Sequence, residues 1–292
     1  MTVPIAAQGY IGIRKEESFG SGGAAVEYQS AFSEDIQITK NYYYGDRIMA
    51  TPSQVGAKLM NVTVAGSITF PVTPAGPEQW WIAGIGGTAS PYAPARPLKS
   101  LVLHIDRETA DIYTSGDMIA SLEFSSSQSN PLQCVAAIEG KGYQKLTQSA
   151  SASFTSGDDP YLHNETIFEF DDVENSDITA FSLSINNNLI TDLFTNSKEK
   201  VAIPATKVSV TGSFTKLFQD TDELDSFLSE LPQKVEVTYF RGNNSFKFAM
   251  NKVMFDNSSS PLSSQSDYVA ETFNFTAFID NTDNNVLTLT VV

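Results

Sequence analysis

Two histidines are the first residues of this chain whose chemistry could support catalysis or metal binding. His104 lies two residues before Asp106 in an alternating strand pattern, where we expect an exposed strand histidine rather than a catalytic one. His163 stands beside Asn164 in a polar stretch. Neither histidine has a second histidine or a cysteine at a ligand spacing, so we expect no zinc site.

Carboxylates cluster at Asp158-Asp159, at Asp171-Asp172 and between Asp220 and Asp225. A calcium loop needs alternating oxygen ligands, a turn glycine and a terminal bidentate glutamate. The last cluster has no such glycine and opens a helical pattern, where the helix dipole favours carboxylates. A glycosidase pair assembled from distant carboxylates stays open, although nothing marks a particular pair. Walker, G-x-S-x-G and dinucleotide-binding motifs are absent. We therefore expect no enzyme, no metal site and no cofactor.

The single cysteine and the two tryptophans have structural interpretations. Cys134 lies in the apolar run Leu132 to Ile138, so we expect a small core residue and no intrachain disulfide. Trp80-Trp81 is compatible with a sugar-stacking platform. Alternatively, Trp81 is a core anchor and Trp80 faces a neighbouring subunit.

The charge of the chain bears on its partners. The 292 residues include 34 acidic and 18 basic ones, a net charge of −16. Sequence-specific nucleic-acid binding needs clustered cations, which this chain lacks. The acidic balance indicates either simple solubility or a surface along which nucleic acid slides without sticking. A secretory signal and a membrane-length apolar run are not visible, so we expect a chain that is made in the cytoplasm and does not enter a membrane.

Short runs of alternating apolar and polar residues dominate the chain and predict half-buried strands. Their apolar members are Ile36 and Ile38; Val62, Val64, Ile68 and Phe70; Leu101, Leu103 and Ile105; Leu183 and Ile185; Val235, Val237 and Tyr239; and Phe273, Phe275 and Ile279.

The chain also repeats itself. Val62 to Phe70 (VTVAGSITF) reappears as Val208 to Lys216 (VSVTGSFTK), with Gly66 and Gly212 in register. Each copy then has a short helical pattern: Trp81, Ile82 and Ile85 in the first, and Phe227, Leu228 and Leu231 in the second. Matching element order predicts an internal duplication.

We place the boundaries of this duplication in a flexible Ser/Gly-rich stretch. The first repeat covers residues 1–148, the linker 149–162 and the second repeat 163–292. In each repeat a first strand is followed by a loop of about twenty residues, Tyr42 to Asn61 and Asn188 to Lys207. Such loops are too long for simple hairpin turns and are commonly functional.

This layout resembles the tail tube proteins of tailed bacteriophages. The resemblance rests on Gly9 to Glu17 followed by a Gly/Ser loop, and on Leu183 to Asn188 followed by a loop and Val208 to Gly212. The resemblance extends over nearly the whole chain, and none of its motifs is as specific as a metal-binding signature. It implies a mainly β fold with two tandem copies of a tail-tube-like β-sandwich or partial barrel, each with one short α-helix. Some members of this family carry two copies, so that three chains complete a pseudo-sixfold ring.

The resemblance implies a structural virion protein whose stacked rings form a channel for double-stranded DNA, with other tail proteins as further partners. If each repeat supplies four strands, six repeats close a barrel of about 24 strands and about 50 Å in diameter. The residues expected to line the channel are Gln37, Thr39, Thr63, Ser67, Thr69, Glu139, Ser184, Asn186, Ser209, Thr211, Ser213 and Asp280. Those expected to contact the next ring are Tyr42, Tyr43, Tyr44, Asp46, Arg47, Met49, Thr191, Asp192 and Phe194.

Two alternatives remain at this point. One is a carbohydrate-binding or adhesin-type β-sandwich that uses Trp80 and Tyr42 to Tyr44 as its platform. The other is the tube of a related injection or secretion machine with a protein cargo. Whether a ring contains three or six chains, and whether the tail contracts, is not encoded in these patterns.

Overall fold

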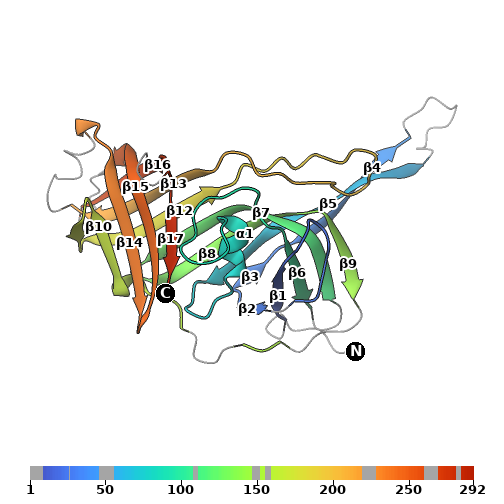
Figure 1. Ribbon diagram of the computed structural model, residues 1–292, viewed down its shortest axis with the longest axis horizontal. Coiled ribbons are helices and arrows are strands. Elements are labelled where there is room, and N and C mark those ends of the chain that lie inside the picture. Colours follow the sequence, from blue (N-terminus) through green and yellow to red (C-terminus); the bar gives the residue numbers. More distant parts are fainter. Residues whose placement is uncertain are drawn as a thin grey trace.

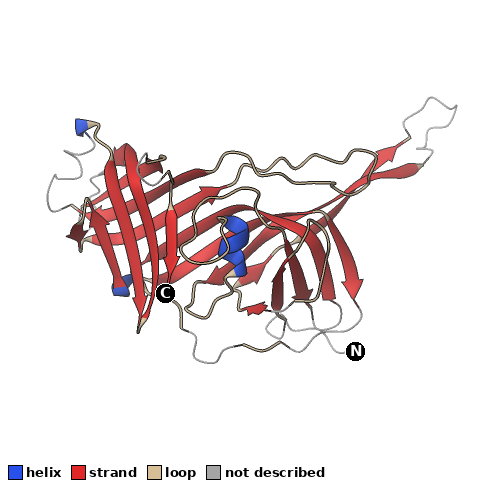
Figure 2. Cartoon of the chain, in the orientation of Figure 1, coloured by secondary structure: helices blue, strands red, loops and turns tan. Residues whose placement is uncertain are grey.

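The computed structural model describes most of the chain (Figure 1). The described residues are 9–25, 27–45, 56–107, 111–146, 152–154, 159–218, 228–259, 269–280 and 284–292. Within them the chain is mainly β, as the alternating patterns predict (Figure 2).

The first half contains β-strands and one short helix. They are β1 (Ile11–Lys15), β2 (Glu27–Gln29), β3 (Ser33–Glu34), β4 (Gln37–Tyr44), β5 (Ala57–Pro71), α1 (Gln79–Gly84), β6 (Leu101–Asp106), β7 (Asp111–Ser127), β8 (Asn130–Gly140) and β9 (Gly142–Leu146). The second half follows with the 3₁₀ helix η2 (His163–Glu165), β10 (Thr166–Phe170), β11 (Val173–Asn175), β12 (Ile178–Asn186), β13 (Ser209–Leu217), β14 (Gln233–Arg241), β15 (Asn244–Ser259), β16 (Ala270–Ala277) and β17 (Thr288–Val291).

Eight strands form one long antiparallel sheet, which we call the long sheet. Its order is β4-β5-β8-β7-β12-β13-β16-β15. The first four strands come from the first half of the chain and the last four from the second half. The two sets meet where β7 pairs with β12, with Ser121 opposite Asn186 and Ser127 opposite Ala180. One sheet therefore runs through both halves (Figure 1).

A smaller sheet accompanies each half of the long sheet. In the first half its order is β2-β1-β6-β7-β9. In the second half its order is β11-β10-β14-β15-β17. The strands β7 and β15 are long enough to belong to both sheets, so each one carries the chain from the long sheet into the smaller sheet.

The registers of the two halves match strand by strand. In the first half Gly66 pairs with Ile138, and Ile138 pairs with Ile119. In the second half Gly212 pairs with Phe275, and Phe275 pairs with Phe255. A β-bulge follows immediately in both halves, between Ile119 and Ser121 and between Phe255 and Asn257. Because bulges mark specific positions in a sheet, the shared bulge is a stronger likeness than shared strand order.

Alternation along each strand puts the apolar side chains on one face, where they form the core. The predicted apolar positions of β5, β6, β12, β14 and β16 are buried, whereas Ile279 lies beyond the end of β16 and is exposed. One core cluster contains residues of both halves. Phe246 of β15, for example, packs edge-on against Trp81 of α1, with ring centroids 5.3 Å apart. The two halves therefore share a core instead of burying two separate ones.

The helix expected in the first half is present and ends just before Gly86 and Gly87, both of which have positive φ. Its apolar residues Trp81 and Ile82 are buried, and so is Ile85, which follows the helix. Most of the helix expected in the second half, including Phe227, lies outside the described residues. Its last turn, at Leu228 and Ser229, is helical and exposed.

Candidate functional site

The polar face of the long sheet carries most of the residues that we expect to line a channel. Residues directly opposite each other in paired strands point to the same face of a sheet. Ala65 lies opposite both Gln37 and Glu139, and Ser184 lies opposite both Thr211 and Glu123. One face can therefore be followed by register across β4, β5, β8, β7, β12 and β13.

All but one of the predicted channel residues share this face. They are Gln37, Thr39, Thr63, Ser67, Thr69, Glu139, Ser184, Asn186, Ser209, Thr211 and Ser213. The registers add residues that the sequence analysis did not select: Ser121, Glu123, Ser125, Gln133, Ser182, Asn274 and Thr276. The alternation within β7 and β8 was the available signal, but it does not reveal that these strands lie in the middle of the long sheet.

Asp280 is the exception among the predicted residues. The strand β16 ends at Ala277, and the backbone of Asp280 is bonded to Asn284 and Asn285 in the following turn. By register the counterpart of Glu139 is Thr276, because Glu139 lies opposite Ala65 and Thr276 lies opposite Thr211. Asp280 therefore does not share this face, because the strand ends three residues before it and the sequence pattern does not show where strand pairing ends.

Hydroxyl and amide side chains on this face bond to one another across the strands. Ser182 Oγ lies 2.8 Å from Ser213 Oγ, and Thr215 Oγ1 lies 3.0 Å from Thr272 Oγ1. Gln133 Nε2 donates to Ser125 Oγ at 3.1 Å. These polar groups are therefore satisfied by neighbouring side chains of the same face.

One buried lysine neutralises an acidic group of this face. Lys200 Nζ donates to Glu139 Oε2 at 2.6 Å, and the Lys200 side chain is almost completely buried. Lys200 belongs to the loop between β12 and β13, whereas Glu139 belongs to β8 of the first half. This ion pair therefore ties the loop of the second half to the first half.

The loop between β12 and β13 crosses the first half of the long sheet (Figure 1). The backbone N–H of Val62 donates to the Lys198 carbonyl at 2.8 Å. Ile203 of this loop joins Leu98 and Met118 in a small apolar cluster. The predicted contact residues Thr191, Asp192 and Phe194 lie on this loop, with Asp192 exposed.

The corresponding segment of the first half is shorter than predicted. Tyr42, Tyr43 and Tyr44 belong to β4 and pair with Leu59, Lys58 and Ala57 of β5, because the strands continue pairing beyond the core. All three tyrosines are exposed. This β4–β5 arm projects from the body of the molecule (Figure 1). Asp46, Arg47 and Met49 lie outside the described residues.

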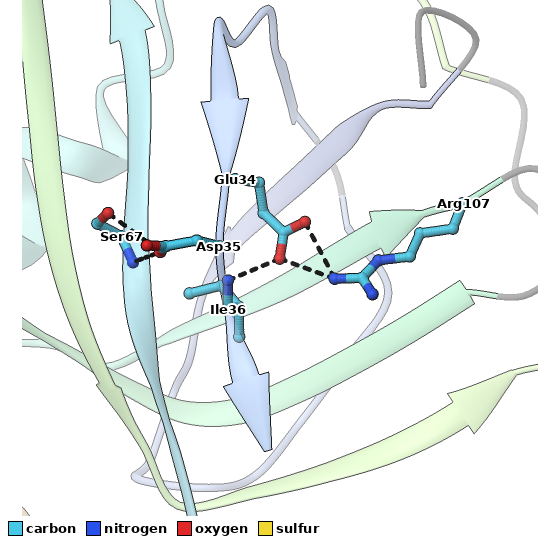
Figure 3. Close-up of polar contacts among 5 residues, drawn as sticks. All are labelled: Glu34, Asp35, Ile36, Ser67 and Arg107. Atoms are coloured by element: carbon cyan, nitrogen blue, oxygen red, sulfur yellow. Dashed lines mark hydrogen bonds and ion pairs between the residues drawn. The ribbon is translucent and has the colours of Figure 1, made fainter. Parts of the chain in front are cut away.

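The start of β4 is held firmly against β5 (Figure 3). Ser67 donates to the Asp35 carboxylate from both its backbone N–H and its hydroxyl, the latter at 3.1 Å. The Glu34 carboxylate accepts from the Ile36 N–H at 2.8 Å and from Arg107 at 3.0 Å. A Cβ atom at Gly66 would lie 2.6 Å from the Asp35 carbonyl oxygen, so only glycine permits this approach. These contacts position β4 as an edge strand.

The two histidines are structural in this fold. His104 is buried, not exposed as predicted, and its Nε2 lies 2.8 Å from Asp111 Oδ2 across the β6–β7 hairpin. His163 is also buried; its Nε2 donates to the Ile178 carbonyl at 3.0 Å. Sequence spacing did not reveal either partner, because the strand pairing brings them together.

The structure also places Ser126 Oγ 3.0 Å from His163 Nδ1, a distance compatible with a nucleophile–base pair. Ser126 Oγ lies 2.8 Å from Tyr239 Oη as well, and all three side chains are buried. A nucleophile needs access to its substrate, whereas this serine is sealed in the core. The group therefore acts as a hydrogen-bonded link between β7, η2 and β14.

Trp80 does not face a neighbouring subunit. It is fully buried, stacks on Phe70 with ring centroids 4.8 Å apart, and donates from Nε1 to Gln29 Oε1 at 3.2 Å. This burial also removes Trp80 from any sugar-binding platform. Cys134 is buried, as predicted, and burial raises the pKa of its thiol well above the ordinary value.

Asp117 is the buried carboxyl whose titration should influence stability. It lies on β7 where the long sheet passes into the smaller sheet, and Thr114 Oγ1 donates to it. Burial raises the pKa of Asp117 to about 7, although the Thr114 hydrogen bond opposes this change. Its folded-state pKa thus exceeds the unfolded value, so the native state binds the proton more tightly.

We expect Asp117 to make the protein less stable as the pH rises from about 4 to about 7, by up to about 4 kcal/mol. Asp117→Asn, which carries no titrating proton, should flatten this dependence and raise the unfolding free energy at pH 8. Urea unfolding between pH 4.5 and 8 measures the effect. Asp192→Asn, at an exposed carboxyl, is the matched control. An unchanged pH profile in Asp117→Asn would contradict the assignment.

Neither a cluster of metal-ligating side chains nor a membrane-spanning helix occurs in the described residues. Within these residues, no three His, Cys, Asp or Glu side chains are grouped to hold a metal ion. None of the helices in the described part of the chain is long and apolar enough to cross a membrane.

Comparison with known proteins identifies the family. A family model described as phage tail tube protein matches residues 6–277, which covers both halves of the long sheet. The curated proteins contain no significant match to this chain. The mainly β fold agrees with the resemblance inferred from the sequence. The chain therefore belongs to the phage tail tube protein family and is a structural component of the virion tail.

Proposed function

We propose that three copies of this chain close into a pseudo-hexameric ring, and that stacked rings form the tail tube through which double-stranded DNA is ejected. The observation that carries this proposal is the β7–β12 pair. It joins two four-stranded units edge to edge inside one chain and leaves β4 and β15 at the two ends of the long sheet. A sheet with open ends gains pairing partners by closing on further copies of itself.

The number of strands supports this stoichiometry. Each chain supplies eight strands to the long sheet, so three chains supply about 24. At about 4.8 Å between strands and a tilt near 40°, the backbone diameter is about 50 Å. Side chains reduce the opening to about 40 Å, which admits a DNA duplex.

The polar face supports its assignment as the channel wall. Serine, threonine, asparagine and glutamine side chains dominate it, and several bond to each other. Its charged members in the described residues include Glu123, Glu139 and Asp256, and Lys200 neutralises Glu139. Affinity for DNA comes mainly from cationic contacts with phosphates, so such a wall lets DNA pass without holding it.

The proposal includes an internal duplication of the chain. The repeats 1–148 and 163–292 would be copies of one tube fold, joined by the linker 149–162. The matching registers and the shared bulge support this division. For ring stacking we propose the exposed β4–β5 arm with Tyr42 to Tyr44, and the β12–β13 loop with Asp192. Other tail proteins would bind the terminal rings.

Electron microscopy and native mass spectrometry of concentrated purified protein test the proposal. We expect rings or tubes with a lumen of about 40 Å and a trimeric building unit. A protein that stays monomeric at every concentration would overturn the proposal, and so would rings with no central opening. A hexameric building unit would overturn the stoichiometry.

A further inference from the structure

The two end strands of the long sheet carry counterparts of an interface that already exists inside the chain. Gly212 lies opposite Leu183 in β12. Extending the β4–β5 register by one residue puts Gly66 opposite Ile36, and a Cβ at Gly66 would lie 2.7 Å from Ile36 Cα. Position 36 in the first half therefore corresponds to 183 in the second, and Thr39 and Lys40 correspond to Asn186 and Asn187.

The other end strand can be matched in the same way. Because Ile119 corresponds to Phe255, the bulge residue Ala120 corresponds to Asp256, and Ser121 corresponds to Asn257. Among the described residues, β15 pairs only with β16 beyond Val253. Its outer edge from Met254 to Ser259 is thus the counterpart of the β7 edge that receives β12.

Asn187 shows what the incoming strand does at this interface. Its backbone N–H donates to the Ala120 carbonyl at 2.8 Å. Its fully buried side chain donates from Nδ2 to the Gly84 carbonyl, at the C-terminal end of α1, at 2.8 Å, and to the Ile119 carbonyl at 3.0 Å. The Asn187 amide thus joins the end of β12 in the second half to the end of α1 in the first half.

The counterparts of these residues carry complementary charges. Lys40 takes the place of Asn187, and Glu230 that of Gly84 at the end of the second helix. The Asp256 carboxylate instead accepts a hydrogen bond from Thr276 Oγ1 on the polar face. Lys40 and Glu230 are both exposed in the isolated chain. A cation is favoured at a helix C-terminus and beside a carboxylate, and an ion pair that becomes desolvated at an interface contributes strongly to specificity.

We propose that β4 of one copy pairs with β15 of the next in the register of the internal β7–β12 pair, with Thr39 opposite Asn257 of the partner subunit. Lys40 then pairs with Glu230 of the partner subunit at the end of its helix. This inference rests on the ring proposed above and adds its register and its charge pair. The neutral amide inside the chain and the charged residue between chains distinguish the two junctions, so that the free β4 edge selects β15.

Disulfide trapping in the full-length protein tests the register. We expect the variant Thr39→Cys with Asn257→Cys to form tubes and, under oxidising conditions, to yield covalent dimers and trimers with no longer ladder. The matched control is Gln37→Cys with Asn257→Cys, shifted by two residues, which should cross-link poorly. The native Cys134 is buried and serves in both variants as an unreactive background.

Charge exchange tests the ion pair. Lys40→Glu and Glu230→Lys should each raise the protein concentration needed for assembly at least about tenfold, and the double exchange should restore assembly. Lys145→Asp, an exposed charge reversal on β9, should have little effect. Thermal unfolding of each variant verifies that the chain remains folded.

The outcomes separate this inference from the proposal on which it rests. Tubes that cross-link only through the Gln37→Cys control would overturn the register and leave the tube function standing. Single charge reversals that assemble like the unaltered protein would overturn the role of Lys40. If the unaltered protein forms no ring or tube at all, the proposed function itself fails.

Discussion

Replacing both Leu228 and Leu231 with serine is expected to abolish tube formation while leaving the chain folded. The corresponding residues of the first half, Ile82 and Ile85, are 4% and 0% exposed. Leu228 and Leu231 are 66% and 67% exposed. The first helix is covered by the second half, as the Asn187 and Phe246 contacts show. We expect the second helix to be covered by the first half of the next subunit in the ring.

Burying two leucine side chains stabilises an interface by about 3–6 kcal/mol, which corresponds to about two to four orders of magnitude in the concentration needed for assembly. Sedimentation and electron microscopy over a concentration series measure this shift. The isolated chain should lose little stability, because neither side chain is buried there.

The matched control for this prediction is Val173→Ser. Val173 is 68% exposed but lies on β11, which pairs with β10 and is not a strand of the long sheet. It should assemble like the unaltered protein. Tubes formed by the double leucine variant at the ordinary concentration would show that this helix does not contribute to the interface.

Replacing Trp81 with alanine is expected to lower the free energy of unfolding by about 3–5 kcal/mol. Trp81 lies where the two halves share their core. Its ring centroid lies 5.6 Å from that of Phe124 in the first half and 5.3 Å from that of Phe246 in the second. The alanine variant would leave a cavity at this junction and remove aromatic contacts from both halves.

Urea unfolding monitored by circular dichroism measures this loss. Trp81→Phe is the control, because it keeps an aromatic ring at the junction and should cost less than half as much. A loss below about 1 kcal/mol for Trp81→Ala would contradict the central role of this residue. So would an alanine variant in which only one half of the chain loosens, since the halves share one core cluster.

Much of the secondary structure could be predicted from the sequence, because burial on one face of a strand leaves a period of two in the residues themselves. Val64 and Phe70 are buried on β5 as that period requires, whereas Thr63 and Thr69 lie on the opposite, polar face. The alternation of apolar residues extends beyond the strand in one place, at the end of β16. It continues to Ile279, although β16 ends at Ala277.

The side-chain partners could not be predicted in the same way. His104 looked exposed because its strand alternates, yet both of its faces are covered and Asp111 lies 2.8 Å away. Lys200 gave no sign of burial, because its partner Glu139 is 61 residues away. Such contacts depend on which strands become neighbours, and a local pattern contains no information about that choice.

By itself, then, the sequence determined the strands, their polar and apolar faces, the core position of Trp81 and the resemblance to the tail tube proteins. Each of these follows from residue type and short spacing, which act locally along the chain. The tertiary structure alone decided that the two four-stranded units join through β7 and β12 into one sheet, and which strands remain at its ends. Strand neighbours are selected by backbone hydrogen bonds and shared core packing between segments far apart in the chain, so they emerge only when the whole chain has folded.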